Sequence, residues 1–322
     1  MKRRQFVALV GGTVVGWPLS AGAQRASEKV ARIGIIDDST IWDPFRQQLR
    51  ELNYVEGQNI LYVYLRTDGS PTQLDAAAEA LARVPVDVII AFGTPRAKAA
   101  QRATKTIPIV AISISNPVGA GLVKNLGRPD GNVTGTTILG PDIVTKKLQI
   151  LKDAFPTASR VAYLWNPDNS ATAEIFEDLR KAVPLFHMTL MSLEARTEVD
   201  FDRVFAQMSS DRPDAVLTTS DPIHQARMPA IIDFLLKQRI AGLFQVRENV
   251  VAGGLMSYGV SLSELFRMGA RYTDGILRGT KPADLPFAQP VTFEFIINLK
   301  TAKAIDLEIP TTVIARADEV IE

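Results

Sequence analysis

The 322-residue sequence contains no cysteine and only two histidines, His187 and His224. Without cysteine the chain has no disulfide bond, no thiolate metal site, no cysteine nucleophile and no cysteine for a lipid anchor after an export signal. Two histidines this far apart do not have the spacing of metal ligands. Neither histidine lies at a strand end, where it could act as the general base that activates a nucleophile. We therefore expect no metal, no cofactor and no catalytic residue, so the protein is not interpreted as an enzyme.

Two motifs that could suggest catalysis are incomplete. Ser257 lacks the flanking glycines of a hydrolase nucleophile turn. The pair Gly119 and Gly121 is followed by Lys124 where a dinucleotide-binding motif needs glycine. We interpret these glycines as packing positions.

The chain also lacks a large excess of either charge, with a formal net charge of +1. No basic stripe or alternation of aromatic and basic residues is present. A nearly neutral chain does not attract a phosphate backbone non-specifically. We therefore expect no nucleic-acid partner.

The one long apolar stretch, near the start, is too short to span a membrane. Three basic residues at positions 2–4 precede an apolar segment that runs to Leu19, and Ala21-Gly22-Ala23 follows. The apolar part has about fourteen residues, against the ~20 that a spanning helix needs. This pattern predicts an export signal over residues 1–23, cleaved near Ala23, and a soluble periplasmic protein of charge −2. The arginine pair also fits twin-arginine export, so both routes stay open.

The stretch from Val86 to Ala100 combines an apolar strand, a glycine turn and a helix start. Gly93 allows a sharp turn, Thr94 can cap the helix with its hydroxyl, and Pro95 suits the first helical position. In an open parallel sheet such helix starts face a crevice at the carboxyl ends of the strands, where their N–H groups bind anions.

Three further apolar strands run into a proline, at Ser115-Asn116-Pro117, Asn166-Pro167 and Ser220-Asp221-Pro222. Two of the four junctions precede residue 135 and two follow it. The mature chain is also longer than one core usually supports. We therefore expect two α/β lobes, each a doubly wound Rossmann-like sheet, with a ligand cleft between them.

The alternation of strands and helices follows the whole chain. We expect strands at 31–37, 59–65, 86–91, 108–114, 160–165, 189–193, 215–219, 241–245 and 254–258, and helices at 44–52, from 71, 95–103, 117–126, 142–155, 170–183, 201–209, 222–238 and 262–278. The extended segment 133–139 is interpreted as a first crossing between lobes, and residues 281–290 as part of a further one.

Polar residues at the strand ends are the candidate ligand contacts. Thr94, with Gly93 and Pro95, is the first choice for an anionic group, and Asp221 for a cationic group, although each residue could simply cap its own helix. Paired across the cleft, they would hold the carboxylate and the ammonium of an amino acid. The remaining candidates share a place at a strand end or turn and are Asp38, Ser39, Ser115, Asn116, Asn166, Ser220, Glu248 and Tyr258. Trp42 and Trp165 could stack on a ring or lie in the core.

Local motifs along the whole mature chain resemble one known family. They are YVEGQN at 54–59, GTP at 93–95, RPDGNVTG at 128–135, AGGLMSYG at 252–259, GTKPADLP at 279–286 and INLKTAKA at 297–304. They are similar to the ABC-transporter substrate-binding proteins that include the tryptophan/tyrosine-type binding proteins, which have the type I periplasmic binding protein fold. The sequence departs from the family at Asp37-Asp38, where relatives more often carry small polar residues, and at Asn116, where many carry an acid.

The resemblance implies two lobes joined by three crossings that form a hinge. The first lobe would comprise residues 30–137, with 262–280 returning to it, and the second 138–260, with 290–322 returning. It also implies a monomeric receptor that closes on a small solute and delivers it to an ABC permease. The expected pairing of Thr94 with Asp221 favours a carboxylate-bearing solute, an amino acid or an aromatic relative. A ligand-sensing subunit for a membrane receptor and a receptor for a sugar or other uncharged solute are the alternatives, and the sequence does not identify the solute.

Overall fold

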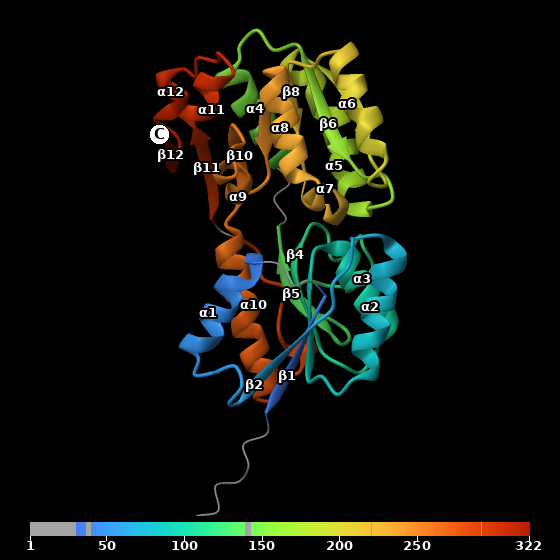
Figure 1. Cartoon of the computed structure of the whole chain (residues 1–322). Helices are drawn as coiled ribbons and strands as arrows, with labels where there is room; N and C mark the ends of the chain where they lie inside the picture. Colours follow the sequence, from blue (N-terminus) through green and yellow to red (C-terminus); the bar gives the residue numbers. More distant parts are fainter. Residues whose placement is uncertain (1–29, 37–39, 139–142, 220, 291) are drawn as a thin grey trace, which may run out of the picture.

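Two β-sheets, one in each half of the molecule, organise the protein (Figure 1). The computed structural model describes residues 30–36, 40–138, 143–219, 221–290 and 292–322. The first sheet has the strand order β2-β1-β3-β4-β5, and all its described pairs are parallel. Its strands are β1 (Ala31–Ile35), β2 (Ile60–Tyr64), β3 (Val88–Phe92), β4 (Ile109–Ile114) and β5 (Val133–Thr137).

Helices cover both faces of this first sheet. The short helix η1 (Thr40–Trp42), α1 (Asp43–Glu51) and α10 (Leu262–Leu277) lie on one face, and α2 (Pro71–Arg83) and α3 (Thr94–Ala103) on the other (Figure 1). Successive side chains of a strand point to opposite faces, so Val88 and Ile90 of β3 join the first core, whereas Ile89 joins the second. This explains the unbroken apolar run in β3.

The second sheet has the order β12-β11-β10-β9-β8-β6-β7. Only the β10–β11 pair is antiparallel among the described pairs. The strands are β6 (Arg160–Trp165), β7 (Thr189–Glu194), β8 (Ala215–Leu217), β9 (Ala241–Phe244), β10 (Met256–Val260), β11 (Phe293–Asn298) and β12 (Glu319–Ile321). Together with its helices this sheet forms the second lobe, and the first sheet with its helices forms the first.

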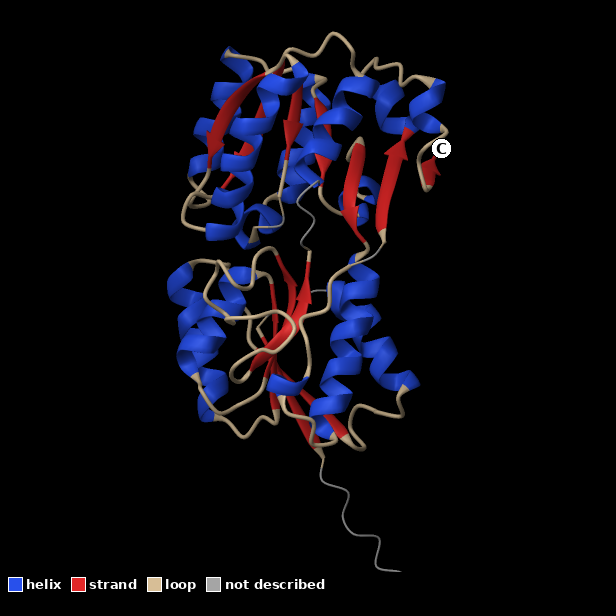
Figure 2. Cartoon of the chain, turned by 180° about the vertical axis from the view of Figure 1, so that it is seen from behind, coloured by secondary structure: helices blue, strands red, loops and turns tan. Residues whose placement is uncertain are grey.

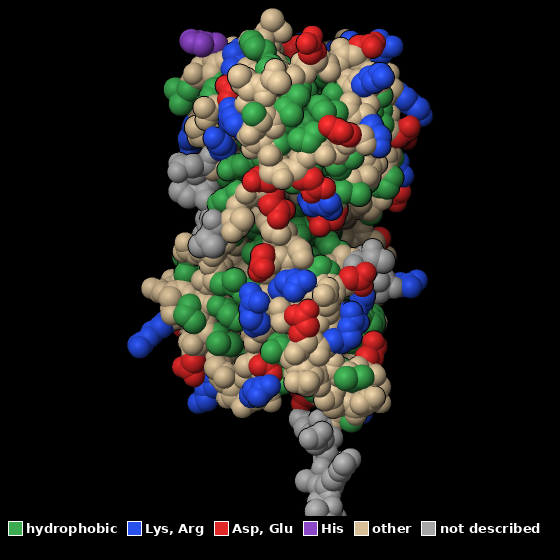
Figure 3. All heavy atoms as spheres, turned by 90° about the vertical axis from the view of Figure 1, so that its left-hand side faces the viewer, with side chains coloured by type: hydrophobic (Ala, Val, Ile, Leu, Met, Phe, Trp, Pro, Cys, Tyr) green, Lys and Arg blue, Asp and Glu red, His purple; other side chains and the backbone are tan. Residues whose placement is uncertain are grey.

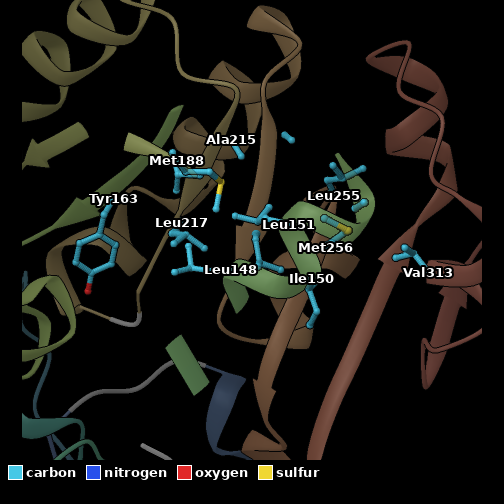
Figure 4. Packing of buried hydrophobic residues seen from close by; sticks show 14 of the residues in the cluster. Leu148, Ile150, Leu151, Tyr163, Met188, Ala215, Leu217, Leu255, Met256 and Val313 are labelled. Atoms are coloured by element: carbon cyan, nitrogen blue, oxygen red, sulfur yellow. The ribbon is translucent and has the colours of Figure 1, made fainter. Parts of the chain in front are cut away.

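The helices of the second lobe again cover both faces of its sheet. They are α4 (Ile143–Ala154), α5 (Ser170–Ala182), η2 (Val183–Phe186), α6 (Asp200–Ser210), α7 (Pro222–Ala226), α8 (Met228–Gln238), α9 (Arg247–Val251), α11 (Leu299–Ala304) and α12 (Thr311–Ile314). In one core Leu148 and Leu151 of α4 pack with Tyr163 and Leu217 of the sheet (Figure 4). The second core includes Phe201 and Val204 of α6 with Ile231 of α8.

The chain passes between the lobes three times, after β5, after β10 and after the short helix η3 (Pro282–Asp284). The helix α10 thereby returns to the first lobe. There the Tyr54 hydroxyl donates to Asp274 at 2.9 Å, and Trp42 meets Phe266 edge to face. The view from behind shows the two lobes one above the other (Figure 2). The exact residue ranges expected for the lobes stay a prediction.

The prediction of a helix at residues 117–126 is wrong. This segment contains turns and bends instead. Gly121 adopts a left-handed φ of 71°, and the side-chain carbonyl oxygen of Asn116 accepts a hydrogen bond from the Gly119 N–H. Leu122 N–H donates back to the Pro117 carbonyl and closes the turn. Gly121 therefore serves to bend the backbone, whereas Gly119 is a packing position, because an added Cβ would lie 2.3 Å from the Asn116 side-chain nitrogen.

The helix expected at 222–238 is divided into α7 and α8. Pro229 has no N–H to donate to the carbonyl of Gln225, so the helix is interrupted at Arg227. The segment 133–139 is extended and precedes the first crossing, as expected, and its residues Val133–Thr137 also pair with the first sheet as the edge strand β5. Residues 281–290 then run beside β5, where Ala288 N–H donates to Gly135.

No helix among the described residues combines the length and the apolar character that crossing a membrane requires. The expected export signal at residues 1–23 lies outside the described residues.

Candidate functional site

A cavity of about 210 Å³ lies between the lobes, and three of the four strand-to-proline junctions line it. We call it the junction cavity. The first lobe contributes Thr94 and Pro95, and the second contributes Asn166, Asp221 and Pro222. The parallel strands of both sheets point their carboxyl ends toward this boundary, which Figure 3 shows as a waist with charged side chains above and below it. The structure thus brings Thr94 and Asp221 to one cavity, as the sequence predicts.

Thr94 does not cap its helix. Gly93 is the N-cap residue, with a φ of 81° that favours glycine, and Thr94 is the first residue of α3 with Pro95 second. The turn at Gly93 is as expected, but the helix begins one residue earlier than expected, at Thr94. The Thr94 side chain is only 4% exposed, and its hydroxyl has no hydrogen-bond partner among the described residues. A buried hydroxyl without a partner costs free energy, which a ligand acceptor would recover.

Asp221 does cap its helix, as the simpler interpretation expected. Its Oδ1 accepts from the Ile223 N–H at 2.9 Å, at the start of α7. Its Oδ2 accepts from the side-chain amides of Asn169 at 2.9 Å and Asn166 at 3.3 Å. The residue is 1% exposed. A carboxylate has about four acceptor positions, so these three bonds leave one for a ligand.

The two walls of the junction cavity differ in charge. The wall from the first lobe carries Lys98, one helical turn after Thr94, and Arg102. The wall from the second lobe carries Asp168 and Asp221. Arg102 is paired with Asp75, and Asp168 lies 3.6 Å from Arg196. The arrangement can therefore hold a negative group against the first lobe and a positive group against the second.

Asn116 joins the two lobes directly. Its side-chain amide donates to both carboxylate oxygens of Glu174 in α5, at 3.2 and 3.1 Å. The lobes also meet at Gly69, where an added Cβ would lie 2.8 Å from the Cβ of Pro222. These contacts hold the lobes close together around the cavities.

Ser115 lines a second cavity, of about 110 Å³, together with Ile138 and Ile143, which flank the first crossing. We call it the hinge cavity. Glu248 lines a third cavity, of about 470 Å³, which shares Gly69 and Pro222 with the junction cavity. Glu248 is exposed as a residue, but partial desolvation of its carboxylate raises the pKa of that group.

Tyr258 is not among the residues that line these three cavities. Its ring stacks on Phe293, with ring centres 6.0 Å apart, and burial raises the pKa of its hydroxyl. Three other candidates, Asp38, Ser39 and Ser220, lie outside the described residues. Trp42 and Trp165 are both core residues, and Trp165 stacks on Phe176 at 4.3 Å.

Sequence reasoning missed Asn169, which holds the Asp221 carboxylate and also caps α5. Its position before Ser170 at a helix start was the available signal. It also missed Lys98 and Glu174, which have no distinguishing local motif. No group of histidine, aspartate or glutamate in the described ranges could hold a metal ion.

A family model described as ABC transporter substrate binding protein matches residues 29–321. A tyrosine-binding protein from Clostridioides difficile (strain R20291) is 25% identical over 265 residues, which are 82% of this chain and 76% of that protein.

Two solved structures show the same fold. The ABC domain in complex with L-Trp from Streptococcus pneumoniae has a TM-score of 0.83 at 23% identity, with 90% of this chain and 99% of that chain covered. A ligand-free, open substrate-binding protein from Clostridium difficile has a TM-score of 0.62 at 24% identity, with 91% and 99% covered. The expected α/β fold with two parallel-sheet lobes is confirmed.

Proposed function

Because the chain belongs to the family of ABC transporter substrate-binding proteins, we propose that it is the exported receptor of an ABC importer and closes on an amino acid or an aromatic relative. The family binds solutes and is not a family of enzymes, and its members work with ABC transporters. Export to the periplasm, a partner permease and a monomeric state belong to this proposal.

The observation that carries the proposal is the opposite charge of the two walls of the junction cavity. On the first lobe, the unpartnered Thr94 hydroxyl and the start of α3 offer donors to a carboxylate, and Lys98 adds a positive charge. A helix start stabilises a negative group by typically 0.3–1 kcal/mol, and by up to ~2 kcal/mol when partly buried. These groups support a contact between the solute's carboxylate and Thr94.

In the same proposal the ammonium of the solute contacts Asp221. The remaining acceptor position of that carboxylate would take a charge-assisted hydrogen bond, which contributes roughly 1.5–3 kcal/mol. Asn166 and Asn169 fix the carboxylate in place before the solute arrives, because both donate to Oδ2. A group held in this way loses little freedom on binding.

The names of known relatives support an aromatic amino acid as the solute. The curated relative is named a tyrosine-binding protein, and one solved structure of the same fold holds L-Trp. The large third cavity adjoins the junction cavity at Gly69 and Pro222 and includes Phe92 and Phe266, which suits an apolar side chain.

A thermal-shift screen of amino acids, aromatic acids and small sugars tests the proposed class of solute. A solute present at 100 times its Kd should stabilise the fold by about 2.7 kcal/mol. We expect stabilisation by one or more amino acids and none by sugars. Stabilisation by an uncharged sugar alone would refute the proposal.

The variant Asp221→Asn tests the ammonium contact. Its new amide would face the Asn166 and Asn169 donors, so some loss of stability is expected even without a ligand. The deaminated acid of the same solute serves as the control. Affinity for the amino acid should fall about tenfold or more, whereas affinity for the deaminated acid should stay nearly constant. Equal losses for both ligands would show that Asp221 acts only through the fold.

A further inference from the structure

Gly69 of the first lobe meets Pro222 of the second lobe, and both residues line the junction cavity and the third cavity. Gly69 is buried. A Cβ added to it would lie 2.8 Å from the Pro222 Cβ, 3.1 Å from the Pro222 carbonyl carbon and 3.3 Å from the Ile223 nitrogen. Carbon atoms in contact prefer a separation of about 3.5–4.0 Å. The backbone of one lobe therefore packs on the other lobe with no space left for a side chain.

Pro222 is held in place within the second lobe. It is the first residue of α7, and its ring has no flexible end that could turn aside. The next residue, Ile223, donates its N–H to the Asp221 carboxylate at 2.9 Å, and two asparagine side chains donate to the same carboxylate. Figure 1 shows α7 at the edge of the second lobe that faces the first. The surface that Gly69 meets is thus a hydrogen-bonded helix start.

Gly69 is also held in place within the first lobe. The Asp68 carboxylate accepts hydrogen bonds from the Ser70 N–H at 2.8 Å and from the Gln73 side-chain amide at 2.9 Å, which ties the residues on both sides of Gly69 to the start of α2. Gly69 has a φ of 85°, a value that glycine adopts far more readily than residues with a Cβ. Because both partners are fixed within their own lobes, a side chain at position 69 could be accommodated only by separating the lobes.

We propose that Gly69 is the positioning residue that sets how closely the two lobes approach each other around the solute. The atoms nearest to an added Cβ belong to Pro222 and Ile223, so a side chain there would act on the spacing of the lobes. This role deepens the proposed function and rests on it, because it assumes that the receptor closes on its solute.

A small overlap at this contact should disfavour the closed arrangement as a whole. Packed interfaces switch between discrete arrangements and do not deform continuously, so a clash of less than 1 Å shifts the population toward the open form. The apparent affinity for a solute falls by the same factor as the fraction of molecules that can close. Loss of closure and loss of affinity should therefore agree in size.

The distance between two spin labels, one on each lobe, tests this role. The chain has no cysteine, so labels can be attached at Ala80→Cys in α2 and Ala206→Cys in α6, which replace exposed residues. In the labelled parent protein, L-tryptophan should increase the population with the shorter distance. Gly69→Ala should lower that population with and without L-tryptophan, and should lower the calorimetric affinity for L-tryptophan by the same factor, about tenfold.

Gly57→Ala is the matched control. Gly57 is an exposed residue of the same lobe with a φ of 80°, and an added Cβ there would have no neighbour within 4 Å. Both variants carry a similar backbone strain, so both should lower the unfolding temperature, but only Gly69→Ala should change the distance. Asparagine tolerates a positive φ better than alanine. Gly69→Asn and Gly57→Asn therefore repeat the comparison if an alanine variant does not fold.

Equal distance populations in Gly69→Ala and Gly57→Ala, with and without L-tryptophan, would overturn the role of Gly69. A loss of affinity in Gly69→Ala without a loss of the shorter distance would also overturn it, because the residue would then act on the solute directly. A distance that depends on residue 69 in a protein that does not bind L-tryptophan would support the role of Gly69 and count against the proposed solute alone.

Discussion

Thr94 is the residue at which sequence reasoning and structure differ in an informative way. The pattern Gly-Thr-Pro locates a helix start correctly, but both Gly93 and Thr94 are acceptable N-cap residues. The backbone conformation decides which of the two residues caps the helix: Gly93 adopts a positive φ and takes the N-cap position. Among the described residues the Thr94 hydroxyl is thereby left without a partner, and a local pattern cannot show this.

Thr94→Val tests whether that hydroxyl serves a ligand. Valine has nearly the same shape and removes a buried hydroxyl that has no partner, so the unfolding temperature without ligand should stay constant or rise. Affinity for the amino acid should fall by roughly 1 kcal/mol, about fivefold. Calorimetry and thermal unfolding measure both quantities.

Thr136→Val is the matched control for that variant. The Thr136 hydroxyl accepts a hydrogen bond from the Ser113 N–H in the core of the first lobe. This variant should lower the unfolding temperature without weakening the solute contact. A Thr94→Val protein that is destabilised and binds normally would contradict the assignment of Thr94.

His224 makes the stability of the second lobe dependent on pH. It is fully buried, its Nε2 lies 3.0 Å from the Ala195 carbonyl, and desolvation lowers its pKa below 6.5 despite the nearby Asp221. The unfolded chain then binds a proton below about pH 6.5 that the folded protein resists, so stability falls as the pH drops through that value.

Thermal unfolding between pH 7.5 and 5.5 tests the contribution of His224. We expect up to about 1.4 kcal/mol of destabilisation per pH unit below the unfolded pKa. His224→Gln keeps a donor for Ala195 and should flatten the profile. His187→Gln changes the other, exposed histidine and should leave the profile as in wild type. Equal profiles for wild type and His224→Gln would contradict this account.

At the scale of the elements, apolar runs and proline junctions predicted most strands and the longer helices of both lobes, but not β11, β12, α9, α11 or α12. The failures have local causes that a propensity argument underestimates. Gly121 in a left-handed conformation prevents the helix expected after Asn116, and the missing N–H of Pro229 divides the helix after Asp221. No local sequence pattern shows that β11 runs antiparallel to β10, because its direction follows from how the chain returns after α10.

The Asn116–Glu174 hydrogen bonds join a loop of one lobe to a helix of the other, so removing them should weaken closure. With saturating amino acid, Glu174→Ala should remain more expanded than wild type by small-angle scattering, and its affinity should fall by up to about tenfold. Glu177→Ala changes an exposed residue of the same helix that pairs with Arg180. It should behave as wild type. Identical scattering of Glu174→Ala and wild type would show that these bonds do not stabilise closure.

At the scale of the whole molecule, the sequence predicts the two lobes but not which side chains meet between them. Thr94 and Asp221 could be paired because parallel strands direct their ends to the same crevice. The contact between Asn116 and Glu174 depends on the relative placement of the lobes, which no local pattern records. The same holds for Lys98 and Asp168, which line the junction cavity from opposite lobes.

Calorimetric titration of wild-type protein with L-tryptophan, tryptamine and indole-3-propionic acid tests the central claim most directly. The three ligands share the indole ring, and the second and third lack the carboxylate and the ammonium, respectively. If the opposite charges of the junction cavity hold a zwitterion, each deletion should cost roughly 1.5–3 kcal/mol, about ten- to a hundredfold in affinity. Equal affinities for all three ligands would contradict the claim that the junction cavity holds a zwitterion.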